Sequence, residues 1–532
     1  MRKIIALFLL ITNLLLLGSC SSTEGSNDGV DEPHVCEFNV EEPKAKYIKT
    51  RSTCTQLAEY YYSCSCGAIG EETFYYGDYA GHVYSKNVDE IYLAKEATVK
   101  TSAVYYKSCS CGHISDVTFE HGETLELTED QRLHLPMSVT VSIFDAQNCI
   151  YGFTYNTLSE PIDPVIQFKR SGENTWTEYA PTSYSSTTYD ADGSLVTYYI
   201  SKAEITLLPD TSYVYRVCDK GADVATPEVN FVTKRSDTDS FTFAHVSDSQ
   251  AGPTEFGWVM ESVSASSDFV LHGGDVVQYA QYEHEWTAML DGNYETVMSI
   301  PIMPITGNHE TSYNNATYEI EKHFNNNIPT QTSTALGYYY SFVYGDVKFI
   351  MLNTSDLTSE NKLKDEQYNW LIGELESNTC KWIVVTMHNP MYSVGKYGAD
   401  ETRNAIAMAL RDQLQGVFVQ YGVDLVLQGH DHAISRTYPI DENGAPKAEA
   451  IESENGIEYI VDPDGVIYLM NGPAGTQSRA PVEIDETLYA YAESSKKGSW
   501  AEITVTGDSL TVTVKWSDGS AERVYHTWGI KK

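Results

Sequence analysis

Basic residues are scarce in this sequence. Its 532 residues include 35 Lys and Arg against 74 Asp and Glu, which gives a formal net charge of -39 at pH 7. A surface with this charge repels polyanions, so we expect no nucleic-acid partner. Apolar side chains are not scarce, since 42% of the residues are hydrophobic. A largely disordered chain is therefore excluded, and the length is enough for roughly three or four domains.

Long hydrophobic runs are absent after the N-terminus. The one near the start, from Ile4 to Leu17, is too short to span a bilayer comfortably and is typical of a signal-peptide core. It ends in Leu17-Gly18-Ser19-Cys20, which resembles the lipobox of a bacterial lipoprotein, in which the cysteine is acylated. We predict a lipoprotein signal peptide over 1–20 with lipidation at Cys20, and a polar linker over 21–33. The protein is then extracytoplasmic and membrane-anchored, at the cell surface or facing the periplasm; the alternative is an ordinary signal peptide with an accidental cysteine.

Two common catalytic motifs are also missing. The sequence has no Gly-x-Ser-x-Gly elbow and no phosphate-binding P-loop. His284-Glu285 begins like a zincin helix, but Ala288 occupies the second histidine position, so that interpretation fails. Serine-hydrolase, P-loop and zincin chemistry therefore have no support in this chain.

Residues 34–126 contain two copies of a cysteine-containing repeat. Cys64-Ser65-Cys66-Gly67 recurs 45 residues later as Cys109-Ser110-Cys111-Gly112. The cysteines of the first copy suffice for one zinc site or two disulfides. These four are Cys36, Cys54, Cys64 and Cys66.

The second copy of the repeat is degenerate. Tyr84 and Val99 stand where the first copy has Cys36 and Cys54, so a strict four-sulfur site is not repeated. An extracytoplasmic location favours disulfides over zinc. We interpret the region as a spacer or a surface-binding module, with contact to cell wall or glycan as one hypothesis.

An alternating, β-branched pattern over 127–235 predicts an all-β sandwich. Strands are expected at Ser138–Ile143, Cys149–Thr154 and Glu228–Thr233. Tyr213 resembles the tyrosine corner of a fibronectin type III-like domain. We expect a structural platform; the alternative is that its loops help to wall a neighbouring active site.

Five short apolar strands between residues 240 and 440 are each followed by Asp, Asn or His side chains. In open α/β sheets, ligands bind at the carboxyl ends of the strands, so these side chains are expected to converge. Mixed oxygen and nitrogen donors suit a pair of divalent metal ions, which a carboxylate such as Asp275 can bridge. The five segments are Phe241–Asp248, Phe269–Asp275, Ile302–Glu310, Trp382–Pro390 and Val423–His432.

The polar motifs at these strand ends resemble the calcineurin-like metallophosphoesterase family. The motifs occur in family order as Asp248-Ser249-Gln250, Gly274-Asp275, Gly307-Asn308-His309-Glu310, His388 and Gly429-His430-Asp431-His432. With the sandwich in front, the chain also resembles purple acid phosphatases. The resemblance implies a four-layer α/β/β/α catalytic domain over 236–475. Residues 476–532, with a predicted hairpin around Gly507-Asp508, would extend one of its sheets.

The resemblance also implies a set of ligands and a reaction. Asp248, Gln250, Asp275 and His432 would hold a first metal ion, and Asp275, Asn308, His388 and His430 a second. The ions would be manganese, zinc, iron or magnesium. A bridging hydroxide would attack a phosphomonoester or phosphodiester, and His309 would stabilise the transition state or protonate the leaving oxygen. The alternative is a cell-surface binding protein with a vestigial phosphoesterase domain.

Two residues depart from the family pattern. Gln250 stands where many members have His, so the first metal is expected to bind weakly or to be a harder ion. Gln278 stands where purple acid phosphatases have a tyrosine ligand, so we expect a colourless protein. The remaining histidines near the motifs are expected to be structural: His245, His272 and His284.

Three neighbouring features are less specific. Glu310 and Asp431 either anchor the ligands or have ordinary surface or capping roles. The segment from Asn389 to Asp400, with Tyr392 and Tyr397, is interpreted as one wall of the substrate cleft.

Overall fold

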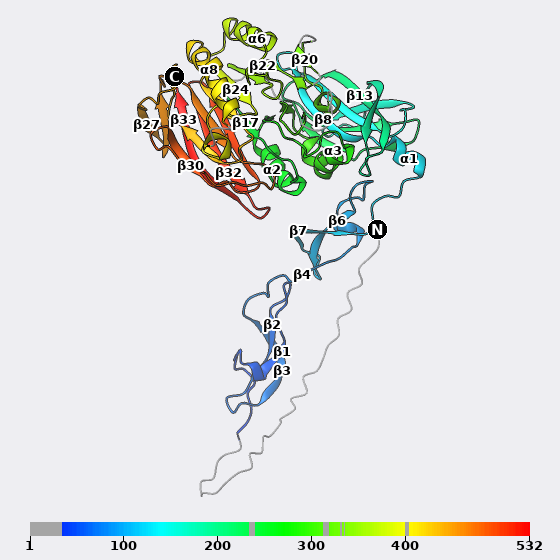
Figure 1. The fold of residues 1–532 in the computed structure, drawn as a ribbon. Helices are drawn as coiled ribbons and strands as arrows, with labels where there is room; N and C mark the ends of the chain where they lie inside the picture. The colour runs from blue at the N-terminus through cyan, green and yellow to red at the C-terminus, as the bar shows by residue number, and fades with distance from the viewer. Residues whose placement is uncertain are drawn as a thin grey trace. The chain divides into compact units, whose positions relative to one another are not determined.

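The structure, a computed structural model, divides the chain into two compact units, Met1–Glu126 and Leu127–Lys532 (Figure 1). It describes residues 34–233, 240–311, 319–329, 332–334, 336–399, 404–482 and 484–532. The predicted signal peptide, Cys20 and the linker lie outside these residues. Within the described ranges, no helix is both long enough and apolar enough to cross a membrane.

The first unit contains two small antiparallel sheets, one from each sequence repeat. Tyr60 pairs with Phe74 in the first sheet, and the equivalent Tyr105 pairs with Phe119 in the second. The two repeats therefore pair their strands in the same register. The first sheet comprises β1 (Ile48–Thr50), β2 (Ala58–Ser63) and β3 (Ile69–Tyr76) after the 3-10 turn η1 (Ala45–Tyr47). The second comprises β4 (Tyr84–Ser85), β5 (Leu93–Lys95), β6 (Ala103–Cys109) and β7 (Ile114–His121), with the 3-10 turn η2 (Glu90–Tyr92).

The expected grouping of the first four cysteines is wrong. The sulfur of Cys54 lies 3.6 Å from that of Cys109 in the second repeat, whereas Cys36 lies 3.6 Å from Cys66. Both separations exceed the roughly 2.05 Å of a disulfide bond, so neither pair is bonded. Sequence spacing had suggested that Cys54 belongs to its own repeat, but its loop reaches the next one.

The second unit begins with the expected β-sandwich. The predicted strands are present as β8 (Met137–Asp145), β9 (Ile150–Thr157) and β16 (Val229–Val232). The hydroxyl of Tyr213 accepts a hydrogen bond of 3.1 Å from the backbone N–H of Leu208. One sheet has the order β12 (Thr182–Tyr189), β13 (Leu195–Thr206), β9 (Ile150–Thr157) and β8 (Met137–Asp145). The other has β11 (Thr177–Tyr179), β10 (Pro164–Arg170), β14 (Ser212–Asp219) and β15 (Val224–Ala225), with β16 (Val229–Val232) beside β14. Helix α1 (Glu129–His134) precedes β8.

The sandwich shares a buried core with the rest of the unit. The Tyr215 hydroxyl donates to the carbonyl of Met298 over 2.8 Å, and the Ser142 hydroxyl donates to that of Ile302 over 3.0 Å. Met298 precedes strand β19 (Ile302–Pro304) and Ile302 begins it, so the sandwich packs against this strand and supports it.

Two large sheets form the remainder of the second unit (Figure 1). The first has the order β19 (Ile302–Pro304), β18 (Phe269–His272), β17 (Ser240–Val246), β31 (Ser499–Thr506), β32 (Ser509–Ser517), β33 (Glu522–Lys531), β28 (Ile457–Val461) and β27 (Ile451–Glu454). The second has β22 (Tyr340–Tyr344), β23 (Val347–Leu352), β24 (Trp382–Met387), β25 (Leu425–Gln428), β29 (Ile467–Asn471), β26 (Ile434–Thr437) and β30 (Tyr489–Glu493). Strands β17 to β19 are parallel, as are β23, β24, β25 and β29. The predicted C-terminal hairpin is confirmed, since β31 and β32 pair with each other and β31 also pairs with β17.

Alternate side chains of the second sheet face two different apolar clusters. Phe349 and Leu427 join the core shared with the first sheet, whereas Ile350 and Val426 pack in a second cluster. That second cluster also contains buried residues of α6 (Asp365–Glu376) and α8 (Ala405–Gln420). Helix α2 (Pro253–Ser266) packs against β31 and β32 of the first sheet, so both sheets carry helices, as the predicted layers require. The smaller elements are α3 (Glu283–Leu290), η3 (Asp291–Asn293), α4 (Tyr294–Val297), α5 (Glu319–His323), α7 (Lys396–Ala399), β20 (Ser333–Thr334) and β21 (Gly337–Tyr338).

Candidate metal centre

Four candidate ligands leave their strands in a strained backbone conformation. Asp248 has φ 56°, Asp275 has φ 55°, His430 has φ 72° and His432 has φ 58°. Residues with a side chain rarely adopt this left-handed region, and such strain clusters at functional sites. Here it marks the loops that follow β17, β18 and β25, at the carboxyl edge of the parallel strands.

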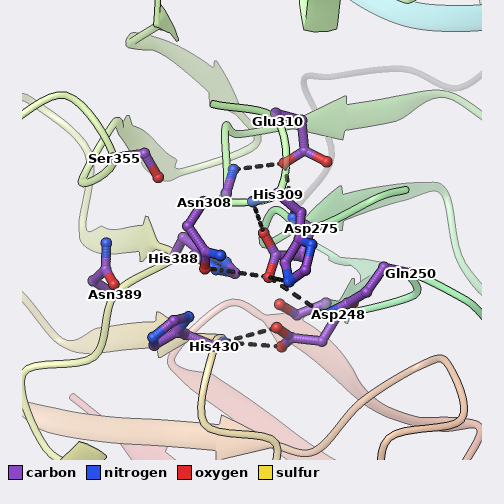
Figure 2. Close-up of polar contacts among 12 residues, drawn as sticks. Asp248, Gln250, Asp275, Asn308, His309, Glu310, Ser355, His388, Asn389 and His430 are labelled. Carbon is purple, nitrogen blue, oxygen red and sulfur yellow. Dashed lines mark hydrogen bonds and ion pairs between the residues drawn. The ribbon is translucent and has the colours of Figure 1, made fainter. Parts of the chain in front are cut away.

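Asp275 lies at the centre of the predicted ligand set (Figure 2). Its Oδ2 is 3.2 Å from Nε2 of His388, and its Oδ1 accepts a hydrogen bond of 2.8 Å from the backbone N–H of His309. Ligand atoms of Asp275, His388 and His430 all lie within 4.8 Å of one another. Three strands therefore deliver donors to one point.

Asp248 and His432 complete the other side of the cluster. Oδ1 of Asp248 is 3.2 Å from Nε2 of His432 and accepts from the backbone N–H of His430 over 2.9 Å. The glycine at 429 permits this approach, because a Cβ there would stand 2.2 Å from the Ser247 hydroxyl oxygen. The loops after β17 and β25 are thus in direct contact.

Backbone carbonyls set the orientation of two histidines. Nδ1 of His388 donates to the carbonyl of Gly273 over 2.8 Å, and Nδ1 of His432 donates to that of Gln477 over 2.7 Å. Each Nε2 then faces a carboxylate with its lone pair available. This is the arrangement that metal-binding histidines adopt.

The two predicted amide ligands also lie in the cluster. Nε2 of Gln250 is 3.4 Å from Oδ2 of Asp275, and Oδ1 of Asn308 is 3.1 Å from Nε2 of His388. Oε1 of Gln250 is buried and has no hydrogen-bond partner among the described residues. A buried polar atom of this kind needs a partner, and a cation between these donors would supply it. The residues present therefore fit divalent metal ions.

The electrostatics of the cluster also favour a cation. Burial lowers the pKa of His388, but the carboxylates of Asp275 and Asp248 outweigh it and raise that pKa to about 9. Burial, together with the charge on His388, lowers the pKa of His430 to about 3. The paired carboxylates thus stabilise positive charge at this point, whether a proton or a metal ion.

Glu310 connects the loops that carry Asp275 and Asn308. Its Oε2 accepts from the backbone N–H groups of Gly307 over 2.7 Å and Asp275 over 2.9 Å, and its Oε1 accepts from Val276 over 2.8 Å. Burial and the neighbouring Asp275 charge raise the pKa of Glu310 to about 7. Of the two roles left open by the sequence, the geometry favours that of an anchor.

Asp431 and Tyr397 lie beside His430. Asp431 accepts from the backbone N–H of Tyr397 over 3.1 Å, and the Tyr397 ring centre is 4.2 Å from that of His430. Tyr392 is different, because it is buried against Tyr468 in the second apolar cluster. The expectation that Tyr392 lines the substrate cleft is therefore wrong, because its side chain belongs to the hydrophobic core.

His309 and Gln278 form a pair at the edge of the cluster. Nδ1 of His309 donates to the backbone carbonyl of Gln278 over 2.9 Å, and its Nε2 lies 3.9 Å from Oδ2 of Asp275. The side-chain nitrogen of Gln278 is 3.1 Å from the His309 ring, and its oxygen accepts from Gln477 over 3.3 Å. The position that would carry a tyrosine ligand in purple acid phosphatases thus supports His309 here.

The segment that carries the candidate ligands matches a known protein family. Residues 241–433 match the family model described as calcineurin-like phosphoesterase. This part of the chain is therefore similar to calcineurin-like phosphoesterases, and we refer to it as the phosphoesterase domain. The matched residues contain every predicted metal ligand and His309.

The phosphoesterase domain also has relatives among curated proteins. The chain is 26% identical over 376 residues to acid phosphatase type 7 of Danio rerio, covering 65% of this chain and 79% of that protein. It is 27% identical over 316 residues to an uncharacterized protein of Mycobacterium tuberculosis, covering 52% of this chain and 58% of that protein. It is 28% identical over 192 residues to purple acid phosphatase 15 of Arabidopsis thaliana, of which the match covers 31%. The match covers less than two thirds of the mycobacterial protein, and the other two relatives are named as acid phosphatases.

Solved structures support the fold. A purple acid phosphatase from yellow lupin (Lupinus luteus) seeds superposes with a TM-score of 0.61 at 17% identity, covering 75% of this chain and 74% of that one. The similarity therefore extends beyond the phosphoesterase domain and into the rest of the second unit.

Two histidines beside the phosphoesterase ligands remain structural. Nδ1 of His245 donates to the side-chain oxygen of Asn471 over 2.5 Å, and His272 contacts the Ser249 hydroxyl at 3.0 Å. Burial lowers the pKa of His245 to about 4 and that of His272 to about 3, so both are neutral near pH 7. His284 is exposed and its ring contacts that of Tyr282.

Proposed function

We propose that this protein is a metal-dependent phosphoesterase that works outside the cytoplasm. The observation that carries the proposal is the convergence of Asp275, His388 and His430 within 4.8 Å at the carboxyl edge of the sheets. The match of the same segment to the calcineurin-like phosphoesterase family supports it. The substrate is a phosphomonoester or a phosphodiester.

The ligands divide into two sets that share Asp275. Two divalent ions held there would activate water as the nucleophile and neutralise the charge of the phosphoryl oxygens. The first set is Asp248, Gln250, Asp275 and His432, and the second is Asp275, Asn308, His388 and His430. The buried side-chain oxygen of Gln250, which accepts no hydrogen bond from the residues that the structure describes, supports its place in the first set.

His309 is proposed to act on the leaving group. Its Nδ1 is occupied by the Gln278 carbonyl, so Nε2 is the atom that faces the cluster. From there an N–H can bond to a phosphoryl oxygen or transfer a proton to the departing alkoxide. The intermediate exposure of His309 leaves room for a substrate on this side.

The deciding experiment is hydrolysis by the purified protein. We would compare p-nitrophenyl phosphate with bis-p-nitrophenyl phosphate in manganese, zinc, iron and magnesium. Asp275→Asn should abolish turnover while the fold is retained, because one ligand charge serves both sets. Asp412→Asn is the matched control, since Asp412 is exposed and pairs only with Lys362 at 2.7 Å among the ion pairs described.

The outcomes of this assay separate the functions. Metal-dependent turnover lost in Asp275→Asn but kept in Asp412→Asn would establish the enzyme, and the preferred ester would distinguish monoesterase from diesterase. A folded protein that neither turns over either ester nor takes up metal would contradict the proposal. It would favour a surface-binding protein with a vestigial phosphoesterase domain.

A further inference from the structure

The first unit brings together two clusters of cysteine and histidine that have the same composition. Each has one histidine and three cysteines, and all ligand atoms within a cluster lie within 4.8 Å of one another. The first cluster is His34, Cys36, Cys64 and Cys66, and the second is Cys54, His82, Cys109 and Cys111. The phosphoesterase centre uses none of these residues.

The distances within the clusters match a tetrahedral metal site. Cys36 and Cys66 have sulfurs 3.6 Å apart, as do Cys54 and Cys109. A zinc ion with Zn–S bonds of about 2.3 Å requires tetrahedral S···S separations of roughly 3.8 Å. The histidines fit as well, because Nε2 of His34 is 3.0 Å from the Cys64 sulfur and Nδ1 of His82 is 3.4 Å from the Cys111 sulfur.

The same tight turn presents two of the cysteines in each cluster. In the first repeat the N–H of Gly67 donates to the Cys64 carbonyl over 2.7 Å, and in the second that of Gly112 donates to the Cys109 carbonyl over 2.8 Å. Both glycines have positive φ, 87° and 90°, which the turn requires. The Cys-x-Cys-Gly sequence therefore holds two thiols close together at the end of each hairpin.

The third cysteine comes from a different place in each cluster. The first repeat supplies its own Cys36, but the equivalent residue of the second repeat is Tyr84, whose hydroxyl contacts His113 at 2.9 Å instead. The missing thiol is Cys54 of the first repeat. Its loop lies near the start of the second repeat, because the N–H of Ala80, two residues before His82, donates to the Thr53 carbonyl over 3.0 Å.

The second repeat has the same loop without a cysteine. There the N–H of Leu125 donates to the Thr98 carbonyl over 2.8 Å, and Val99 occupies the position of Cys54. No third repeat follows within residues 34–126, so a thiol at Val99 would have no cluster to complete. The two differences in the second copy therefore have one explanation: Tyr84 leaves a thiol position that Cys54 of the first repeat fills, and Val99 stands where a thiol would have no site to complete.

We propose that the repeats bind two zinc ions in Cys₃His sites, and that the second site is shared between the repeats through Cys54. Sulfur and imidazole donors at tetrahedral spacing select zinc over magnesium or calcium. The first site closes the first repeat, and the second fastens the two repeats together. Small sheets with little buried core commonly depend on such metal sites for stability.

The test is reconstitution of the full chain with cobalt(II) under reducing conditions. Thiolate ligands give cobalt an intense charge-transfer band in the near ultraviolet, whereas the phosphoesterase centre has no sulfur ligand. We expect this band to report two equivalents of cobalt and to disappear when zinc is added. Asp275→Asn should leave it unchanged, so the result is independent of the proposed enzymatic function.

Cysteine variants test which residues share a site. Cys36→Ser and Cys54→Ser should each remove half of the band, and the double variant should remove all of it. If Cys36 and Cys54 belonged to one site, the double variant would lose no more than either single variant. Cys380→Ser is the control, because Cys380 lies in neither cluster and should keep the full band.

Misfolding of the variants can be detected separately. All eight tryptophans lie between Trp176 and Trp528, so their fluorescence reports only the second unit. We expect its unfolding transition to be the same in every cysteine variant. Absence of the band in the reduced full chain, equal loss in the single and double variants, or disulfides linking these cysteines in a non-reduced peptide map of freshly isolated protein would overturn the proposal.

Discussion

The two regions of this molecule that gather metal-type ligands do so in opposite ways. In the phosphoesterase centre, carboxylates, amides and imidazoles follow strands of large sheets, and Asp248, Asp275, His388 and His432 are almost fully buried. In the repeats, thiolates and imidazoles lie on small hairpins, and only one cysteine of each cluster is buried. The large core positions its ligands without a bound ion, whereas the small repeats would need the bound ion for their own stability.

Chelation gives the largest expected contrast between the regions. Treatment of the full chain with a strong chelator should reduce ester hydrolysis to the background rate while the second unit stays folded, as its tryptophan fluorescence reports. In the repeats, it should expose residues 34–126 to trypsin and leave a resistant fragment that begins near Leu127. Proteolysis followed by mass spectrometry measures this, and repeats that stay as resistant as the second unit would contradict the contrast.

Loss of His309 should be the next largest effect. We expect His309→Ala to lower kcat by about 10²–10⁴-fold, because proton transfer to the leaving group contributes that much in general acid catalysis. The loss should be greater for phenyl phosphate than for p-nitrophenyl phosphate, whose leaving group needs little protonation. His284→Ala is the matched control, since His284 is exposed. Equal losses for the two esters would point to a purely structural role of His309.

A smaller effect is expected at Glu310, which touches backbone rather than substrate. In Glu310→Gln an amide N–H would face the backbone donors of Gly307 and Asp275, so the two ligand loops should separate slightly. We expect activity and metal affinity to fall by about 10–100-fold. Glu376→Gln on the exposed end of α6 should change neither. Metal titration of the hydrolysis rate measures both quantities, and unchanged affinity would argue against an anchoring role.

The smallest expected effect is a gain. Gln250→His replaces a neutral amide by an imidazole between Asp275 and His432, so less metal should be needed for half-maximal activity, by about tenfold or less. The exposed Gln420→His is the control. A higher metal requirement would mean that the buried pocket around Gln250 is shaped for an amide.

Much of the phosphoesterase centre could be predicted from local sequence. Each ligand follows a short apolar strand, and parallel strands bring their carboxyl ends to one edge, so the convergence of Asp275, His388 and His430 needs only the strand pattern. The groups that orient these ligands could not be predicted. The carbonyls of Gly273 and Gln477 hold His388 and His432, and since every residue has a backbone carbonyl, the sequence does not show which one will be used.

The repeats show the opposite balance. The sequence shows the thiol ligands, but spacing along the chain assigns Cys54 to its own repeat and does not mark His34 and His82 as ligands. Tyr392 is a similar case, because a tyrosine near a ligand motif can line the substrate cleft or belong to the hydrophobic core, and the sequence does not distinguish the two.

Apolar periodicity and motif spacing were enough to predict where five ligand-bearing strands lie along the chain, which residue types follow them and that the chain has two cysteine repeats. Which of these residues share a metal centre depends on contacts between segments that are distant in the sequence. Cys54 lies beside His82 because a backbone hydrogen bond joins Thr53 to Ala80, two residues before His82, and Glu310 anchors Asp275 because two strands end side by side. Such contacts depend on distances across the fold, which spacing along the chain does not encode.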